Sequence, residues 1–125
     1  MKRDLDLCRE LMLEFEAAPP GTFIQSVDLK NREECDSATV FAHIDLLIGA
    51  GYLVGKAVVD PNQTHSAFFV TKITWEGHDF IDCARNDTVW SKTKDRLKQA
   101  GAWTFSLALE ILKDEAKKQF GTLLI

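Results

Sequence analysis

His43-Ile-Asp-Leu-Leu-Ile-Gly-Ala-Gly-Tyr-Leu53 is the stretch in which the sequence changes from a helical pattern to a strand pattern. The apolar residues Val40, Ile44, Leu47 and Ile48 recur at helical spacing and predict a helix from Asp36 to about Gly49. Glycine commonly follows the last turn of a helix, and Gly51 supplies that stop. The segment 52–59 is rich in Val and other apolar residues, so a strand is expected to begin directly after the glycine.

A second strand is predicted a short distance downstream. Asp60-Pro-Asn-Gln-Thr64 is a turn-rich stretch, and Ala67-Phe-Phe-Val-Thr-Lys-Ile73 resumes the strand pattern. Two strands around one polar loop predict a β-hairpin over residues 52–73. Thr74 is a candidate cap for the helix that follows, since a Thr hydroxyl accepts from free backbone N–H groups.

The rest of the chain is predominantly helical by the same criteria. The predicted elements are a helix over 4–18 that Pro19 ends, a short strand within 22–29, and a helix that Thr74 opens. Two further helices are predicted: one over 89–99, which the segment Asn86-Asp87-Thr88 caps and Gly101 closes, and a last one that Thr104 opens. The order helix, strand, helix, hairpin therefore precedes a helical C-terminus.

That order is typical of a winged helix, in which one helix is presented outward and a hairpin, the wing, flanks it. The segment 43–53 resembles the leucine-rich helix end, glycine and first wing strand of winged-helix regulators, and Ile73-Thr-Trp-Glu-Gly-His78 resembles their wing exit. We predict an α+β, mainly helical fold: a winged helix-turn-helix over residues 1–84, with a C-terminal helical extension over 85–125 packed on it as a single structural unit.

Four segments also resemble a family of uncharacterised bacterial and prophage proteins known only as a domain of unknown function. They are Met1–Leu7, the pattern Asp36, Val40, His43 and Leu47, Thr74–His78, and Arg85–Trp90. The chain departs from the family pattern in a longer insert over 23–34 and in Tyr52, where an aliphatic residue is usual. The resemblance implies a winged-helix core and an association with mobile genetic elements, but no known activity.

Composition places the chain among ordinary globular proteins. Its 125 residues are 46% hydrophobic and 27% charged, which suits one domain. Cys8, Cys35 and Cys83 are odd in number and form no CxxC pair, so we expect free, buried thiols in a reducing compartment. No signal peptide and no apolar run of membrane-spanning length is apparent, so a cytoplasmic location without a membrane partner is expected.

Motifs for catalysis are absent from the sequence. There is no glycine-rich phosphate loop, nucleophile elbow or HExxH pattern, so we expect a non-catalytic protein without a cofactor. The three histidines, His43, His65 and His78, do not pair with further ligands at zinc-binding spacing, so no metal site is expected. His43, on an otherwise apolar helix, is predicted to form hydrogen bonds within the core.

Charge distribution bears on binding to DNA. Residues 1–84 hold 7 Lys and Arg against 14 Asp and Glu, whereas residues 85–125 hold 8 against 5. The helix 36–49 has no Lys or Arg, so it cannot neutralise phosphate, the dominant source of DNA affinity. Under a DNA-associated regulatory function, the predicted nucleic-acid contacts are Ser37, Thr39 and His43 at base edges, with Lys56, Arg85, Lys92 and Arg96 at phosphates.

A protein-interaction or dimerisation module is the alternative, and sequence reasoning leaves the two open. Its acidic face comprises Glu33, Glu34 and Asp36, which would engage a host or phage protein. The last helix carries an apolar stripe that either covers the domain core or forms a homodimer seam. The stripe residues assigned to interaction are Phe105, Leu109, Leu112 and Phe120.

Overall fold

The computed structural model describes residues 3–19, 24–25, 37–59, 66–101 and 104–121, with side chains described for all of these except 24–25, 37–38, 57–59, 66–67 and 105. The elements, in chain order, are α1 (Leu5–Ala17), β1 (Ile24–Gln25), α2 (Ser37–Gly49), β2 (Leu53–Val59), β3 (Ser66–Ile73), α3 (Trp75–Ala84), α4 (Asp87–Ala100) and α5 (Phe105–Gly121). The chain divides into two compact units, unit 1 over Met1–His78 and unit 2 over Asp79–Ile125, and the boundary falls inside α3.

Helix α1 begins at a side-chain cap. The Asp4 carboxylate accepts a hydrogen bond of 3.2 Å from the Leu7 N–H, which satisfies one of the free donors at the helix start. Pro19 follows the extended Ala18 and prevents the helix from continuing. One stripe of α1 is buried, and it consists of Leu5, Leu7, Cys8, Leu11, Met12 and Phe15.

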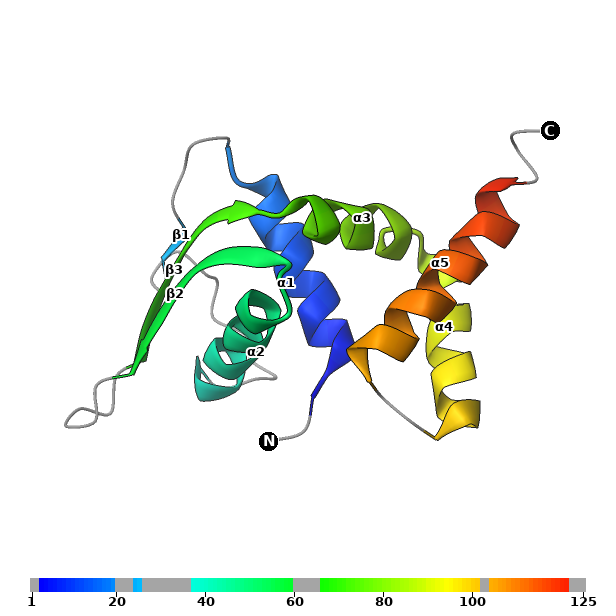
Figure 1. Cartoon of the computed structure of the whole chain (residues 1–125), viewed down its shortest axis with the longest axis horizontal. Coiled ribbons are helices and arrows are strands. Elements are labelled where there is room, and N and C mark those ends of the chain that lie inside the picture. Colours follow the sequence, from blue (N-terminus) through cyan, green and yellow to red (C-terminus); the bar gives the residue numbers. More distant parts are fainter. Residues whose placement is uncertain (1–2, 20–23, 26–36, 60–65, 102–103, 122–125) are drawn as a thin grey trace. The chain divides into compact units, whose positions relative to one another are not determined.

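Helix α2 packs between α1 and the hairpin. Ile44 and Leu47 are fully buried, and the ring of Phe41 meets the ring of Phe68 on β3 with centroids 6.3 Å apart. Figure 1 shows α2 alongside the hairpin, with α1 next to it. The core of unit 1 therefore lies between these two helices and the inner face of the hairpin.

The sheet is antiparallel and small, with the strand order β1-β3-β2. β1 contributes two residues, which pair with Val70 and Phe69 of β3. Along the hairpin, β2 and β3 pair from Leu53 opposite Ile73 to Val59 opposite Ser66. The hairpin predicted over residues 52–73 is confirmed.

One irregularity interrupts the hairpin. The pairing shifts between Val54 and Gly55, so that Thr71 on β3 is an extra residue, and its hydroxyl donates a hydrogen bond of 3.1 Å to the Val54 carbonyl. A Cβ atom at Gly55 would collide with the Phe69 carbonyl oxygen, so this close approach of the strands requires glycine. The bulge reverses the alternation of side chains along β3.

Thr74 joins the hairpin to α3. Its hydroxyl donates to the Gly51 carbonyl at 2.6 Å and accepts from the Gly77 N–H at 3.0 Å, while its own N–H donates to the Tyr52 carbonyl at 3.0 Å. The predicted Thr74 cap is therefore confirmed. The same residue fixes the start of α3 against the turn before β2.

Unit 2 contains the rest of α3 together with α4 and α5. Asn86 caps α4 by accepting from the Val89 N–H at 3.1 Å, and Gly101 ends it in the left-handed conformation. Thr104 caps α5 through the Leu107 N–H at 3.1 Å. The Thr104 cap agrees with the sequence prediction, whereas α4 begins at Asp87, two residues before the predicted start, with Asn86 as the cap within the predicted segment 86–88. The Phe80 and Trp90 rings meet edge to face at 6.2 Å.

The mainly helical α+β class predicted from the sequence is confirmed for the described part of the chain. Of the strand expected within 22–29, the structure describes Ile24 and Gln25, and the remainder lies outside the described residues. Among the cysteines, Cys8 is free and buried, Cys83 is free and half-buried, and Cys35 lies outside the described residues. That the C-terminal helices pack on the first part of the chain stays a prediction.

Replacing Gly77 by Ala should lower the free energy of unfolding by about 1–3 kcal/mol. A Cβ atom at this position of α3 would collide with the Tyr52 carbonyl oxygen and would lie 2.7 Å from the Ile73 methyl carbon Cγ2. Gly49→Ala, in α2, is the matched control, because nothing lies within 4 Å of its added Cβ. Urea denaturation should show a lower midpoint for Gly77→Ala alone, and equal midpoints would contradict the packing described for α3.

Candidate nucleic-acid interface

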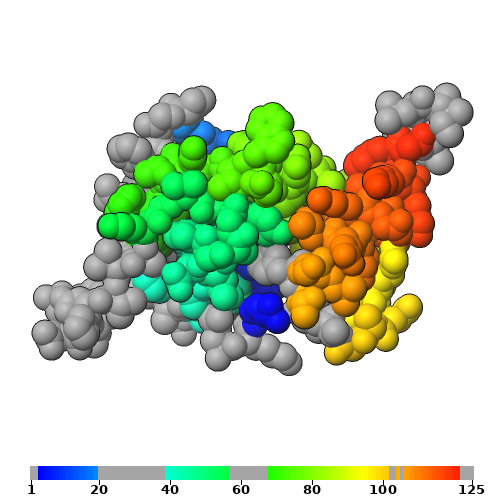
Figure 2. Space-filling model, viewed as in Figure 1, coloured from blue at the N-terminus to red at the C-terminus, as the bar shows by residue number. Residues whose placement is uncertain are grey.

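The helix predicted to be presented outward, α2, offers little to a nucleic acid. Figure 2 shows α2 at the surface of unit 1. Its one charged residue, Asp45, is exposed, and Thr39 is half-buried. Ser37 begins the helix, and its side chain lies outside the described ones. A carboxylate on a helix without Lys or Arg repels phosphate, so this surface does not attract DNA.

His43 is buried in the core of unit 1 and is not available for base contact. Its side chain is fully buried, Nδ1 lies 2.8 Å from the Thr39 carbonyl, and Nε2 accepts the Asp4 N–H at 2.9 Å. A neutral ring with the proton on Nδ1 satisfies both contacts. The prediction that His43 bonds within the core is confirmed, and its assignment as a nucleic-acid contact is wrong because the ring is inaccessible.

Exposed cations occur instead on the hairpin. Lys56 pairs directly with Phe69, and Lys72 pairs directly with Val54, so each pair shares one face of the ladder. Both lysines are exposed, as are Val54 and Phe69, at 40% and 39%. The opposite face carries buried Leu53, Phe68 and Val70. We call the exposed set Val54, Lys56, Phe69 and Lys72 the outer face.

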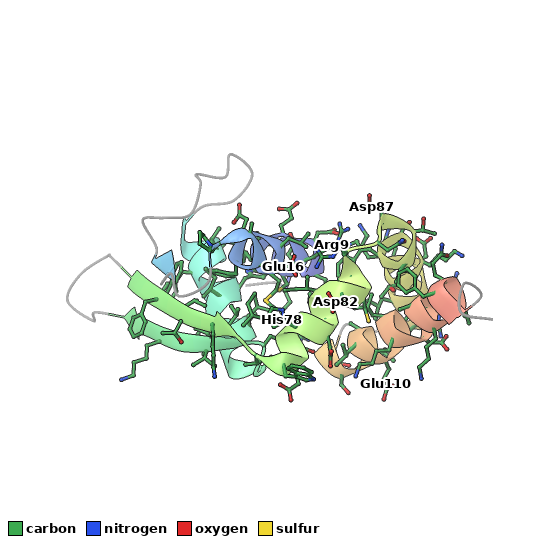
Figure 3. The ribbon with its side chains drawn as sticks, turned by 90° about the horizontal axis from the view of Figure 1, so that it is seen from above. Arg9, Glu16, His78, Asp82, Asp87 and Glu110 are labelled. Atoms are coloured by element: carbon green, nitrogen blue, oxygen red, sulfur yellow. The ribbon has the colours of Figure 1, made fainter. Side chains whose placement is uncertain are left out.

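The bulge is what brings these four residues together. Phe69 and Lys72 are three positions apart, so simple alternation would place them on opposite sides of β3. The extra residue Thr71 restores them to one side. Figure 3 shows nitrogen-tipped side chains leaving the two strands of the hairpin on the same side.

The outer face carries no carboxylate. Neither β2 nor β3 contains Asp or Glu, and the described part of the structure shows no ion pair to Lys56 or Lys72. No carboxylate of the described residues therefore compensates either ammonium group. Of the four outer-face residues, the sequence prediction included Lys56, and it missed Lys72 and Phe69 because the bulge is not visible in the residue pattern.

Trp75, at the start of α3, is 81% exposed, more than any other large apolar residue described. It precedes Gly77 by two positions, about 200° around the helix, and Gly77 packs on the base of the hairpin. Trp75 therefore points away from that packed side. The Thr74 hydrogen bonds hold it next to the end of β3.

The cations predicted in unit 2 do not form one free surface. Lys92 is exposed on α4. Arg85, which precedes α4, is also exposed, and its guanidinium nitrogen lies 3.5 Å from an Asp82 carboxylate oxygen. Arg96 instead donates to Asp114 at 2.7 Å and to Glu115 at 3.0 Å on α5. These two carboxylates compensate its charge and weaken its attraction to phosphate, and its assignment as a phosphate contact stays a prediction.

The predicted protein-interaction residues are only partly placed. Glu33, Glu34 and Asp36 lie outside the described residues, as does the side chain of Phe105. On α5, Leu112 is buried, Leu109 is half-buried and Phe120 is 36% exposed. Leu112 therefore belongs to a buried surface, and whether α5 forms a dimer seam stays a prediction.

A search of the described residues finds no group of three or more His, Cys, Asp or Glu arranged to hold a metal ion. Among the same residues, no helix combines the length and apolar character needed to span a bilayer.

Comparison with known proteins shows the family. Residues 2–103 match the model described as hypothetical protein (DUF2513). The chain belongs to the DUF2513 family. An uncharacterized protein of Haemophilus influenzae (strain Rd) is 31% identical over 117 residues, covering 94% of this chain and 93% of that relative. No solved structure gives a significant match. Membership in a family of unknown function, as the sequence resemblance implied, is confirmed.

His43→Ala should lower the free energy of unfolding by about 2–4 kcal/mol, since it leaves a cavity and an unsatisfied Asp4 N–H. Asp45→Ala, on the exposed side of the same helix, should change it by less than about 0.5 kcal/mol. Urea denaturation checks both values. A His43→Ala protein with unchanged stability and weakened DNA binding would contradict the core role of this residue.

The ion pair between α4 and α5 predicts a pH dependence. Hydrogen bonds from Arg96 and Lys118 hold the pKa of the Asp114 carboxyl below its ordinary value. The resulting stabilisation is complete above the pKa of an unfolded aspartate and is lost as the pH falls through the lower folded value.

Thermal denaturation from pH 7 to acid pH should therefore show a smaller loss of Tm below about pH 5 for Arg96→Gln than for the unchanged protein. Lys117→Gln, which removes an exposed lysine of the same helix, should follow the unchanged protein. Parallel curves for Arg96→Gln and the unchanged protein would show that the pair adds nothing to stability.

Proposed function

We propose that this DUF2513 protein is a non-catalytic, DNA-associated winged-helix module whose wing, not its presented helix, makes the principal contact. The single observation that carries the proposal is the outer face, where two exposed lysines lie on one side of the hairpin without a neighbouring strand carboxylate. The element order and the pairing of the short β1 with β3 support the winged-helix assignment.

Charge favours the hairpin over the other surfaces of unit 1. The residues from 1 to 84 are acidic overall, and α2 exposes Asp45. A polyanion approaching this unit is therefore repelled except where cations gather. Lys56 and Lys72 provide such a place, and Lys92 on α4 is a further exposed cation in unit 2.

Contact of this kind positions a protein on the phosphate backbone without reading base sequence. Lysine ammonium groups act as point charges toward phosphate, and the counterions they release make the affinity depend on salt. The association with mobile genetic elements implied by the sequence resemblance stays a prediction, as does action on a host or phage protein through the acidic face.

Binding of a mixed-sequence DNA duplex should weaken as salt increases, and the double variant Lys56→Ala, Lys72→Ala should bind more weakly. Each lysine lost from a phosphate contact should reduce the slope of log affinity against log salt by about 0.9. Fluorescence anisotropy of labelled duplex across a salt series measures both quantities.

The control is Lys113→Ala, Lys117→Ala, which removes two exposed lysines of α5 and the same formal charge. It should leave the slope closer to that of the unchanged protein than the hairpin variant does. Absence of duplex binding at about 50 mM salt, or equal slopes for the two double variants, would overturn the proposal.

A further inference from the structure

The outer face has an apolar component that phosphate contact does not use. Phe69 lies between Lys56 across the ladder and Lys72 along its own strand, and Trp75 follows Lys72 by three positions. Single exposed apolar residues are common on protein surfaces. Here, however, the exposed Lys72 lies between two exposed aromatic residues, Phe69 and Trp75, along one continuous stretch of chain, and the exposed Lys56 lies across the ladder from Phe69.

Alternation of rings and cations is the chemistry used to bind single-stranded nucleic acid. A base stacks on an aromatic ring, and the backbone between bases follows the positive charges. The faces of bases in a duplex are already covered by their neighbours, so a ring on a strand face can stack only on an unpaired base. Sheet surfaces that carry exposed aromatic residues bind RNA in this way.

We propose that the outer face, extended by Trp75, is a stacking platform for single-stranded nucleic acid. Phe69 and Trp75 take the bases, and Lys56 and Lys72 take the phosphates. This inference rests on the proposed function and adds to it the form of nucleic acid that is preferred.

The backbone positions of the two aromatic residues are fixed by different means. Phe69 is fixed by the strand pairing around the Gly55 bulge, where its own carbonyl makes the close approach to Gly55. The Thr74 bonds to Gly51 and Gly77 fix the backbone that precedes Trp75, whose side chain is largely exposed. Because the backbone is fixed at both positions, stacking of a base requires no ordering of the chain that carries the rings.

Acidic neighbours limit where phosphates can lie. Glu76 is exposed directly after Trp75, and Asp79 is exposed one helical turn later. Their carboxylates repel phosphate, so the backbone of the bound strand lies toward the two lysines. Trp75 then forms one end of the platform. At this end a base stacks on the ring, but no phosphate is bound.

The experiment compares three labelled probes by anisotropy at low salt: a short oligothymidylate, an abasic oligonucleotide of equal length, and a duplex. The abasic probe retains the phosphates and lacks the bases. The unchanged protein should bind oligothymidylate about 10-fold more tightly than the abasic strand or the duplex. Phe69→Leu and Trp75→Leu should each remove most of that preference and leave abasic binding unchanged.

Phe120→Leu is the matched control, because Phe120 is a similarly exposed phenylalanine on α5. It should retain the preference for oligothymidylate. Leucine keeps an apolar side chain at each position, and the circular dichroism spectrum and Tm establish that every variant is folded. As a second readout, tryptophan emission should fall on binding of oligothymidylate to the unchanged protein, and this change should be largely lost in Trp75→Leu.

The outcomes separate this inference from the proposed function. Equal affinity for all three probes, or an unchanged preference in both leucine variants, would overturn the stacking platform while salt-dependent duplex binding through the lysines still stood. If none of the three probes is bound, both proposals are overturned.

Discussion

The register of the β2–β3 hairpin is the constraint on which the surface of unit 1 depends. A one-residue change of pairing moves every following side chain to the other side of a strand. In this hairpin the change occurs at Gly55, where the strands approach too closely for any larger residue, and Thr71 is accommodated by a hydroxyl contact to the Val54 carbonyl. Because of it, Phe68 and Val70 are buried while Phe69 and Lys72 are exposed together.

The base of the hairpin is fixed by a second constraint, and the two act together. Thr74 bonds to the turn before β2 and to the first turn of α3, and Gly77 allows that helix to lie against Tyr52 and Ile73. Val54, Lys56, Phe69, Lys72 and Trp75 are therefore exposed at defined positions along the two strands and at the start of α3. The aromatic residues and lysines of this surface keep a fixed order only if both the register shift at Gly55 and the Thr74 contacts are preserved.

The fold could be predicted largely from local signals. Helix caps at Thr74, Asn86 and Thr104 are side chains that satisfy backbone donors three residues later, and they mark helix starts in the sequence itself. The hairpin was predictable because two apolar strands flank a polar loop. His43 was correctly expected in the core, since a polar ring on an apolar helix needs hydrogen-bond partners when it is buried.

The candidate surface was less predictable, for reasons of geometry. Arg96 looks like a free cation until α5 brings Asp114 and Glu115 beside it, and that pairing spans eighteen or more residues. Lys72 and Phe69 look like opposite faces of a regular strand, because a bulge leaves no pattern in one sequence beyond a glycine. Trp75 is a large aromatic residue, a type that sequence patterns usually assign to a core, but it is exposed at the start of α3.

The most direct measurement of the central claim is a map of amide chemical shifts during titration with oligothymidylate. The largest changes should fall at residues 54–56, 69–72 and 75–77, on the hairpin and the first turn of α3. Changes concentrated in α2, or in α4 and α5, with the hairpin amides unmoved, would contradict the assignment of nucleic-acid contact to the wing.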